Sequence, residues 1–190
     1  MMDAVALPLN DIPKPPIPRP TSDLVVEQLR RWMFQPREYV SAREFDPGTG
    51  TLSTGRRLDL FCIATAPSKR NCQRVGIEVK ISRSDWLREL RTPEKRRVAL
   101  RICNKFYIAA PVGVVKPEEL PDGIGLIECP WDMIFFDRRR WGGKAEWVWD
   151  SPKQTVKAEW RDTPAPTWSL VASFGRRVAD EKVSDKGEPS

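Results

Sequence analysis

Two short runs decide the fold: Arg57-Leu-Asp-Leu-Phe-Cys-Ile-Ala64 and Gln73-Arg-Val-Gly-Ile-Glu-Val-Lys80. Both are rich in branched and aromatic residues, which are typical of β-strands. The segment between them, residues 65–72, contains the turn formers Pro, Ser and Asn. The two runs are therefore predicted to be neighbouring antiparallel strands.

Polar side chains gather on one face of this strand pair. A turn centred on Ser68 and Lys69 places Asp59 opposite Glu78, where facing side chains on one sheet surface lie ~5 Å apart. Because side chains alternate along a strand, Lys80 shares this face with both carboxylates. The apolar residues expected to point the other way, into a core, are Leu58, Leu60, Ile77, Val79 and Ile81.

Two carboxylates and an ammonium group at such short range favour a bound divalent cation. Like charges at this distance repel and raise one pKa unless a cation lies between them. Mg²⁺ takes oxygen ligands, often only one or two carboxylates, and completes its shell with water and substrate phosphate. A lysine beside it would orient a water or neutralise charge on a phosphorane-like transition state. The pattern of Asp59, Glu78 and Lys80 therefore indicates phosphodiester hydrolysis.

Asp59 together with Glu78-Val79-Lys80 resembles the signature of the PD-(D/E)XK nuclease superfamily. The resemblance covers residues 21–129 and implies a restriction-endonuclease-like α/β core, a mixed β-sheet flanked by helices. Asn104 departs from the pattern, since relatives often carry Asp after this Cys, and the role of that Asp is open here. Three downstream segments extend the likeness to the MmcB-type DNA repair branch: Ser82-Arg-Ser-Asp-Trp-Leu-Arg-Glu-Leu-Arg91, Cys103-Asn-Lys-Phe-Tyr-Ile-Ala-Ala-Pro111 and Glu119-Leu-Pro-Asp-Gly-Ile-Gly-Leu-Ile127.

Two further carboxylates are candidates for the same site. Glu27 lies on a helix expected over residues 21–34, and a glutamate on the first helix often joins the metal site in the resembled superfamily. Glu44 ends a strand expected over residues 37–45. For both residues the alternative is an ordinary solvated charge, and that alternative stays open.

The chain is basic, which favours a polyanionic partner. Its 190 residues carry a formal net charge of +6, and the sequence pI is about 9.3. Phosphate contacts supply most sequence-independent affinity for nucleic acids, although a charge run can also be a solvated helix face. The candidate DNA-binding residues are Arg56, Arg57, Arg83, Arg88, Lys95 and Arg96, and the same run also contains Arg91, Arg97 and Arg101.

Several function classes are excluded by composition. The chain has no histidine, so His-dependent nucleases and Ser-His-Asp hydrolases are ruled out. Its four cysteines form no C-x-x-C pair and are expected to be buried free thiols. No apolar run approaches the ~18 residues of a membrane span, and no signal peptide is visible. Ser82 and Ser84 are expected to cap a helix rather than to act as nucleophiles.

Four segments are expected along the chain. Residues 1–20 are proline-rich and predicted to be disordered, and residues 21–129 form the nuclease-like core. Residues 130–175 form a Trp/Arg-rich extension packed on the core, which includes a β-hairpin around Gly142-Gly143. Its tryptophans either cover a core face or stack on unpaired bases. Residues 176–190 are predicted to be a flexible tail.

A second helix start is predicted at residues 92–94, and further strands over residues 106–110 and 123–129, with a parallel crossover joining residues 75–110.

The function expected is a metal-dependent deoxyribonuclease of DNA repair, recombination or phage DNA processing. Asp59, Glu78 and the Val79 carbonyl would hold Mg²⁺ or Mn²⁺, Lys80 would act on the water, and Glu27 would support the site. Two alternatives are a catalytically inactive DNA-binding module and an interaction protein in which Asp59 and Lys80 form an ordinary ion pair. The expected partner is DNA, and no membrane association is expected. The expected location is the cytoplasm of a bacterial or phage-infected cell, and whether the chain forms a homodimer is left open.

Overall fold

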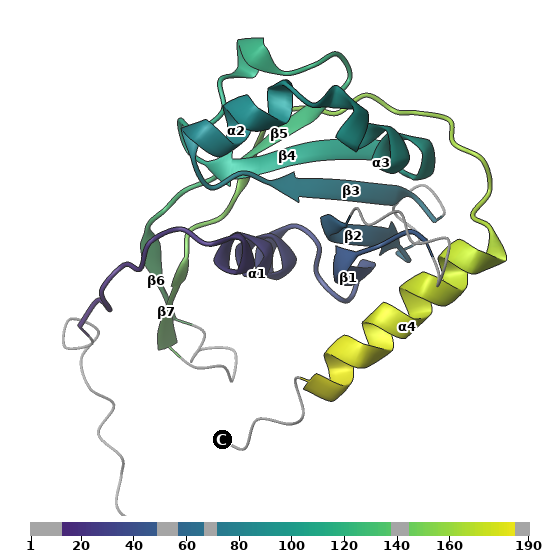
Figure 1. The fold of residues 1–190 in the computed structure, drawn as a ribbon. Coiled ribbons are helices and arrows are strands. Elements are labelled where there is room, and N and C mark those ends of the chain that lie inside the picture. The colour runs from purple at the N-terminus through teal and green to yellow at the C-terminus, as the bar shows by residue number, and fades with distance from the viewer. Residues whose placement is uncertain (1–12, 49–56, 67–71, 138–144, 185–190) are drawn as a thin grey trace, which may run out of the picture.

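A six-stranded mixed β-sheet lies at the centre of the chain, with strand order β1-β2-β3-β4-β5-β8 (Figure 1). The computed structural model describes residues 13–48, 57–66, 72–137 and 145–184. The strands are β1 (Tyr39–Phe45), β2 (Leu58–Ala64), β3 (Arg74–Val79), β4 (Lys105–Pro111), β5 (Gly125–Cys129) and β8 (Lys153–Val156). A separate two-stranded hairpin contains β6 (Met133–Asp137) and β7 (Ala145–Trp149), as predicted.

Helices cover both faces of the sheet (Figure 1). On one face lies α1 (Ser22–Trp32). The helices that follow β3 lie on the other face: α2 (Arg83–Leu90), the 3₁₀ turn η3 (Pro93–Arg96) and α3 (Arg97–Ile102). A second 3₁₀ turn, η4 (Pro117–Glu119), precedes β5, and α4 (Trp168–Ser184) ends the described chain. This arrangement confirms a mixed α/β fold with helices on both sides of the sheet.

The strand pair β2–β3 has the register that the sequence predicts. Leu60 pairs with Ile77 and Ile63 pairs with Arg74 in antiparallel fashion, so one further step brings Asp59 opposite Glu78. The next pair, β3–β4, is parallel, which confirms the predicted crossover through α2 and α3. The site residues therefore lie at the end of β3 from which the chain enters α2.

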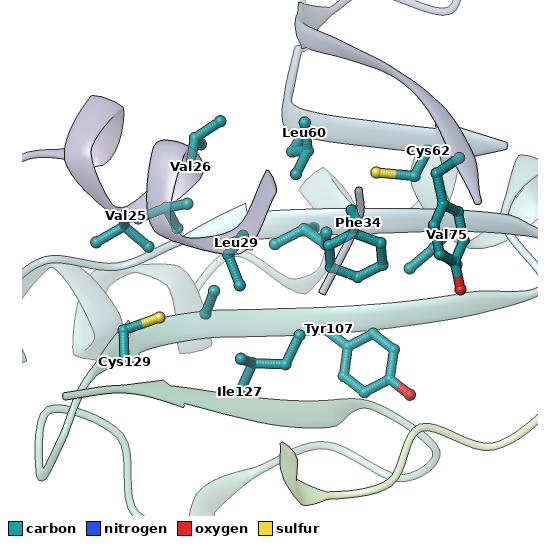
Figure 2. Close-up of a cluster of buried hydrophobic side chains, with 14 of the residues drawn as sticks. Val25, Val26, Leu29, Phe34, Leu60, Cys62, Val75, Tyr107, Ile127 and Cys129 are labelled. Atoms are coloured by element: carbon teal, nitrogen blue, oxygen red, sulfur yellow. The ribbon is translucent and has the colours of Figure 1, made fainter. Parts of the chain in front are cut away.

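The core consists of two apolar clusters, one on each face of the sheet. Figure 2 shows the first, in which Val25, Val26 and Leu29 of α1 face Leu60 and Ile127. These helix residues follow the spacing of an amphipathic helix. The second cluster contains Phe61, Phe106 and Ile108 beneath α2 and α3 and is closed by α4.

Two expected core residues lie elsewhere. Leu58 packs in the second cluster rather than with Leu60, next to a break in strand alternation at Glu44, whose φ is +43°. Phe45, which follows Glu44 and pairs with Leu58, lies in the same cluster, as expected where a left-handed residue redirects the side chains that follow it. Ile81 is 36% exposed because β3 has ended at Val79.

Hydroxyl side chains cap α1 and α2, and Ser82 is one of the two caps expected from the sequence. The Thr21 hydroxyl accepts a hydrogen bond from the Leu24 N–H, and the Ser82 hydroxyl accepts one from the Asp85 N–H. Each satisfies one of the unpaired donors of a first helical turn. The helix expected from Thr92 begins as the 3₁₀ turn η3 at Pro93 and becomes regular only at Arg97.

The C-terminal part differs from the sequence prediction. Residues 153–156 add β8 to the main sheet beside β5, so the sheet continues past the expected boundary at residue 129. The tail expected from residue 176 is helical as far as Ser184. Glu181 ties this helix to the core, because its carboxylate accepts from the Arg43 N–H and pairs with Arg30.

The β6–β7 hairpin is fixed against α1. The Gln28 amide donates to the carbonyls of Pro130 and Asp150, and the Trp32 indole donates to the Trp149 carbonyl. Trp149 is buried and stacks on Trp131, with ring centroids 4.4 Å apart. These two tryptophans thus cover a core surface, which was one of the two roles expected for them.

The N-terminal residues 13–20 have no regular secondary structure and run beside this hairpin, where the Pro18 carbonyl accepts from the Trp131 indole. The four cysteines are free thiols: Cys62, Cys103 and Cys129 are buried as expected, whereas Cys72 is exposed. Among the helices that the structure describes, none combines the length and apolar character that a bilayer-spanning helix requires.

Candidate active site

The Asp59 carboxylate occupies the end of the β2–β3 ladder. Its Oδ2 accepts a hydrogen bond of 2.6 Å from the Val79 N–H. In a regular antiparallel continuation this N–H would bind a backbone carbonyl of β2. Because N–H and C=O of one strand residue point to the same side, the Val79 carbonyl also points toward β2 and Asp59. The local break in the ladder therefore gathers a carboxylate and a backbone carbonyl.

Glu78 and Lys80 share one face of β3, as the alternation predicts. The Lys80 ammonium donates to Glu78 Oε1 at 2.8 Å, and the two side chains are only 8% and 23% exposed. Within the described chain, Lys80 forms its ion pairs with Glu78 and Glu89 and not with Asp59. The ordinary Asp59–Lys80 pair of the interaction-protein alternative is therefore absent there.

Glu89 of α2 extends the site into the protein interior. Its Oε2 lies 3.3 Å from Lys80 Nζ, while its Oε1 accepts from the Arg96 guanidinium at 2.9 Å. Arg96 also donates to the Glu89 backbone carbonyl at 3.0 Å. Glu89 and Arg96 are each only 6% exposed. A buried chain of alternating charges, Glu78–Lys80–Glu89–Arg96, results.

Burial and mutual repulsion perturb the two acids of the strand pair. The pKa of Glu78 is raised to about 7, first by burial and then by the Asp59 charge, against the opposing effect of Lys80. The pKa of Asp59 is also raised, mainly by burial, although the Val79 N–H partly offsets this. Burial is the largest single effect on Lys80 and lowers its pKa, but the combined attraction of Glu78, Glu89 and Asp85 outweighs burial, so that pKa is raised. Lys80 is thus held as an ammonium beside an acid that ionises near neutral pH.

The donor set fits a hard divalent cation. Asp59 and Glu78 offer carboxylate oxygens and Val79 offers a carbonyl oxygen, which are the ligands Mg²⁺ and Mn²⁺ prefer. A cation between the two acids would also relieve the repulsion that raises the pKa of Glu78. Among the described residues, however, no group of three or more acidic, Cys or His side chains is placed to hold one ion. The fit is therefore to a metal with two protein carboxylates.

The additional carboxylates proposed from the sequence are not gathered here. Glu27 lies on the exposed side of α1, because Val26, Gln28 and Leu29 form its buried side. No contact of Glu27 with Asp59, Glu78 or Lys80 is found among the described residues, and its role at a metal site stays a prediction. Glu44 is half exposed and pairs with Arg57 at 3.4 Å, and its charge raises the pKa of Asp59 from a distance.

Two site residues were not predicted from the sequence. Asp85 and Glu89 lie in the helix that Ser82 and Ser84 were expected to cap, with no site role predicted, yet both charges act on Lys80, and Asp85 also acts on Asp59. The signal was present in the spacing, because residues 85 and 89 lie one turn apart on one side of α2. Only the packing of α2 over β3 shows that this side faces the site.

The candidate DNA-binding residues separate into two groups. Arg83 and Arg96 already pair with carboxylates of the chain, Arg83 with Glu119 and Arg96 with Glu89. The Arg83 bonds lower the pKa of Glu119 to about 2. Exposed members are Arg57, Arg88, Arg91, Arg97 and Arg101. Arg56 and the Lys95 side chain lie outside the described residues.

Asn104 has a structural role in joining three segments of the chain. Its Oδ1 accepts from the Arg74 N–H at 2.9 Å, and its Nδ2 donates to the Arg161 carbonyl and the Thr163 hydroxyl, both at 3.0 Å. An amide can do both, whereas an aspartate could only accept. Asn104 thus joins β3 and β4 to the segment that follows β8.

Comparison with known proteins adds to the fold only. No family model matches the chain, and no curated protein matches it. A solved structure described as the SPO1766 protein of unknown function from Silicibacter pomeroyi is similar, with a TM-score of 0.58 and 19% identity. The match covers 88% of this chain and 94% of that one. At this identity the likeness bears on the arrangement of helices and strands.

Proposed function

We propose that the chain is a metal-dependent deoxyribonuclease built on a restriction-endonuclease-like core. The observation that carries this proposal is the meeting of Asp59, Glu78 and Lys80 at the end of the β2–β3 pair, where Asp59 replaces a backbone partner of Val79. Burial of two acids beside one lysine lowers the free energy of unfolding, so such a cluster is not expected from a purely structural role. Groups of this kind are typical of functional sites.

Each residue has a distinct role in the proposal. Asp59, Glu78 and the Val79 carbonyl would hold Mg²⁺ or Mn²⁺. When bound, such an ion acts as a Lewis acid on a phosphoryl oxygen and lowers the pKa of a coordinated water. Lys80 would orient the attacking water and stabilise negative charge that develops on the phosphate. Glu89 would fix the Lys80 ammonium on the side away from Glu78.

DNA as the substrate is supported by charge. The net charge of +6 and the exposed arginines of α2 and α3 favour a polyanion. Arg91, Arg97 and Arg101 are exposed on the segment that begins directly beside the site. They are therefore better placed for phosphate contacts than Arg83 and Arg96, which are already engaged by carboxylates.

The experiment is a cleavage assay on supercoiled plasmid and on single-stranded DNA with Mg²⁺, Mn²⁺ or EDTA. Asp59→Asn and Lys80→Met are each expected to lower the rate at least ~100-fold, as loss of one transition-state contact does. Asp122→Asn and Lys116→Met are the matched controls, since both residues are exposed on the loops before and after η4. Cleavage that survives in both site variants would count against the proposal.

A second candidate is a DNA-binding module without turnover. It is favoured by the Lys80 ammonium, which two carboxylates already engage, and by the lack of a third acid for the metal among the residues that the structure describes. This candidate predicts salt-dependent DNA binding that Arg91→Ala and Arg97→Ala weaken. It also predicts no cleavage with either metal. The same protein preparation therefore separates the two candidates.

A further inference from the structure

A second concave site lies on the α1 face of the sheet, at the end of β3 away from Lys80. A cavity of about 420 Å³ opens where α1 ends, between Phe34 and the strands that carry Val75 and Tyr107. Figure 2 shows these three side chains at one end of the buried cluster. From Val75 to Lys80, the rise of a strand gives a separation of ~17 Å. The cavity is therefore distinct from the candidate active site.

Aromatic side chains form much of its wall. Trp32, Phe34, Tyr39 and Tyr107 all line the cavity. Phe34 and Tyr39 hold each other edge to face, with ring centroids 5.1 Å apart. Such a wall suits a flat ring. Aromatic faces stack on one another, and an apolar wall costs less free energy to desolvate when the ring binds than a polar wall does.

An amide without a hydrogen-bond partner in the described chain lies in the same wall. Gln73 is 9% exposed, and within the described chain its side chain makes no hydrogen bond, although its backbone carbonyl accepts from the Ala64 N–H. Gln73 lines this cavity and also an adjoining one of about 520 Å³ that reaches Trp160. Its amide atoms are not among the fully buried polar atoms that lack a partner, so they reach the water of the cavity, which a ligand with its own donor and acceptor would replace.

The charges around the two cavities balance. Lys105 and Lys157 are opposed by Glu38 and Glu159. A second amide, Gln154, uses its Oε1 to accept from the Tyr107 hydroxyl at 2.9 Å, which leaves the Nε2 end as a donor. The site thus combines aromatic walls, amide donors and acceptors, and no net charge among these four groups.

We infer that this cavity binds a neutral heteroaromatic ring with a donor–acceptor edge, the chemistry of a nucleobase, with Gln73 as the residue that reads the edge. The same chemistry is offered by a free nucleoside and by an unpaired base of a DNA strand. The inference does not depend on the metal site, because no residue is shared between the two.

The test titrates the metal-free protein, in EDTA, with the four deoxynucleosides and follows the indole N–H signals of Trp32 and Trp160 by NMR. At least one nucleoside is expected to shift the Trp32 signal and to saturate. Gln73→Leu should weaken this binding at least about tenfold while it preserves or raises the melting temperature, since an unpaired amide is replaced by an apolar group of similar shape. Gln35→Leu, whose amide is bound to the Arg31 carbonyl, is the matched control and should bind as the wild type does.

An oligodeoxythymidylate and an abasic oligonucleotide of equal length distinguish the two sources of the ring. Tighter binding of the base-containing strand than of thymidine assigns the site to DNA, and equal binding assigns it to free nucleosides. Absence of a saturable shift with every nucleoside, or unchanged affinity in Gln73→Leu, overturns the inference. Either result is independent of the cleavage assay with Asp59→Asn, because the cleavage assay requires the metal and this titration is done without it.

Discussion

The carboxylate of Glu89 lies directly against the ammonium of Lys80, with 3.3 Å between Oε2 and Nζ, in a region where both side chains are more than nine-tenths buried. Glu89 also holds Arg96, so that one acid serves two cations. Lys80 in turn donates to Glu78. The position of the candidate catalytic lysine is therefore determined by a helix residue that the strand signature does not contain.

Removal of the Glu89 charge should destabilise the protein. Glu89→Gln leaves Lys80 and Arg96 without their shared anion, and loss of one partner from a buried pair costs about 3 kcal/mol. Urea unfolding measures the change in the free energy of unfolding. Glu94→Gln, an exposed acid on η3, is the control and should change it by less than ~0.5 kcal/mol. Equal stability of the two variants would show that the buried charges are not mutually dependent.

The stability of the metal-free protein should fall as pH rises from about 5 to 8. The pKa of Glu78 is about 7 in the folded chain, above its ordinary value of 4.5, because burial and Asp59 disfavour the carboxylate. The folded state thus binds this proton more tightly than the unfolded state, and its stabilising effect disappears as pH passes through 7. The size is on the order of 2 kcal/mol, given 1.36 kcal/mol per pKa unit and partial solvent access. Since the chain has no histidine, few other groups titrate in this range.

Urea unfolding in EDTA at several pH values measures this slope, and Glu78→Gln should flatten it. The raised pKa of Asp59 acts in the same direction at the acid end. The lowered pKa of Glu119, about 2, acts in the opposite direction, because its stabilising effect is lost as the pH falls. That loss occurs only below about pH 5, outside the range of this measurement. A wild-type slope that persists in Glu78→Gln would assign the titration to another group.

Manganese should raise the melting temperature, and more at pH 8 than at pH 6. A proton on Glu78 competes with the ion, because a carboxylate must ionise before it can bind a metal. At a metal concentration of about 100 times the dissociation constant, binding stabilises the folded state by ~2.7 kcal/mol. Differential scanning fluorimetry measures the shift. Asp59→Asn should abolish it, whereas Asp122→Asn should retain it; an equal shift in both would mean that the ion binds elsewhere.

The site was predictable from the sequence where it depends on local rules. Asp59, Glu78 and Lys80 lie on strands whose alternation and turn position follow from neighbouring residues, and the β2–β3 register agrees with the prediction. Glu89 and Arg96 were not predictable, because charges on a helix are normally solvated and only the docking of α2 on β3 buries them.

Glu27 shows how a family pattern can conflict with a local one. The apolar residues around it already assign it to the outer side of α1, since Val25, Val26 and Leu29 are the buried ones. The helical period therefore predicts the outward orientation of Glu27, whereas its role at a metal site, which the resemblance implies, stays a prediction. Similarly, the missed α4 contains Leu170, Phe174 and Val178 at a spacing of four, which is the helical signal.

Asn104→Asp, the exchange to the residue expected here from the sequence resemblance, should destabilise the protein. The acid cannot donate to the Arg161 carbonyl or to the Thr163 hydroxyl, and it places negative charge against that carbonyl. The nearby Arg74 guanidinium offsets part of this, so a loss of ~1–2 kcal/mol is expected. Gln154→Glu is the matched amide-to-acid control, because Gln154 Oε1 acts as an acceptor for Tyr107 and a carboxylate can do the same. A neutral result for Asn104→Asp would mean that the segment after β8 is not held by this amide.

The helix α4 should be an integral part of the core rather than an appendage. Phe174 meets Phe45 and Phe61 edge to face, with ring centroids 5.7 and 5.4 Å away, and is 8% exposed. Phe174→Ala removes this contact and leaves a cavity, so a loss of ~3–4 kcal/mol is expected in urea unfolding.

Trp168, on the first turn of the same helix, provides the control because it is 87% exposed. Trp168→Ala removes a larger side chain from the same element, yet should change the free energy of unfolding by less than ~0.5 kcal/mol, since little of it is buried. Similar losses in the two variants would indicate that α4 contributes through its own helical stability. A loss confined to Phe174→Ala would indicate that α4 contributes by packing on β1 and β2, and hence that residues after 167 are required for the fold that supports Asp59.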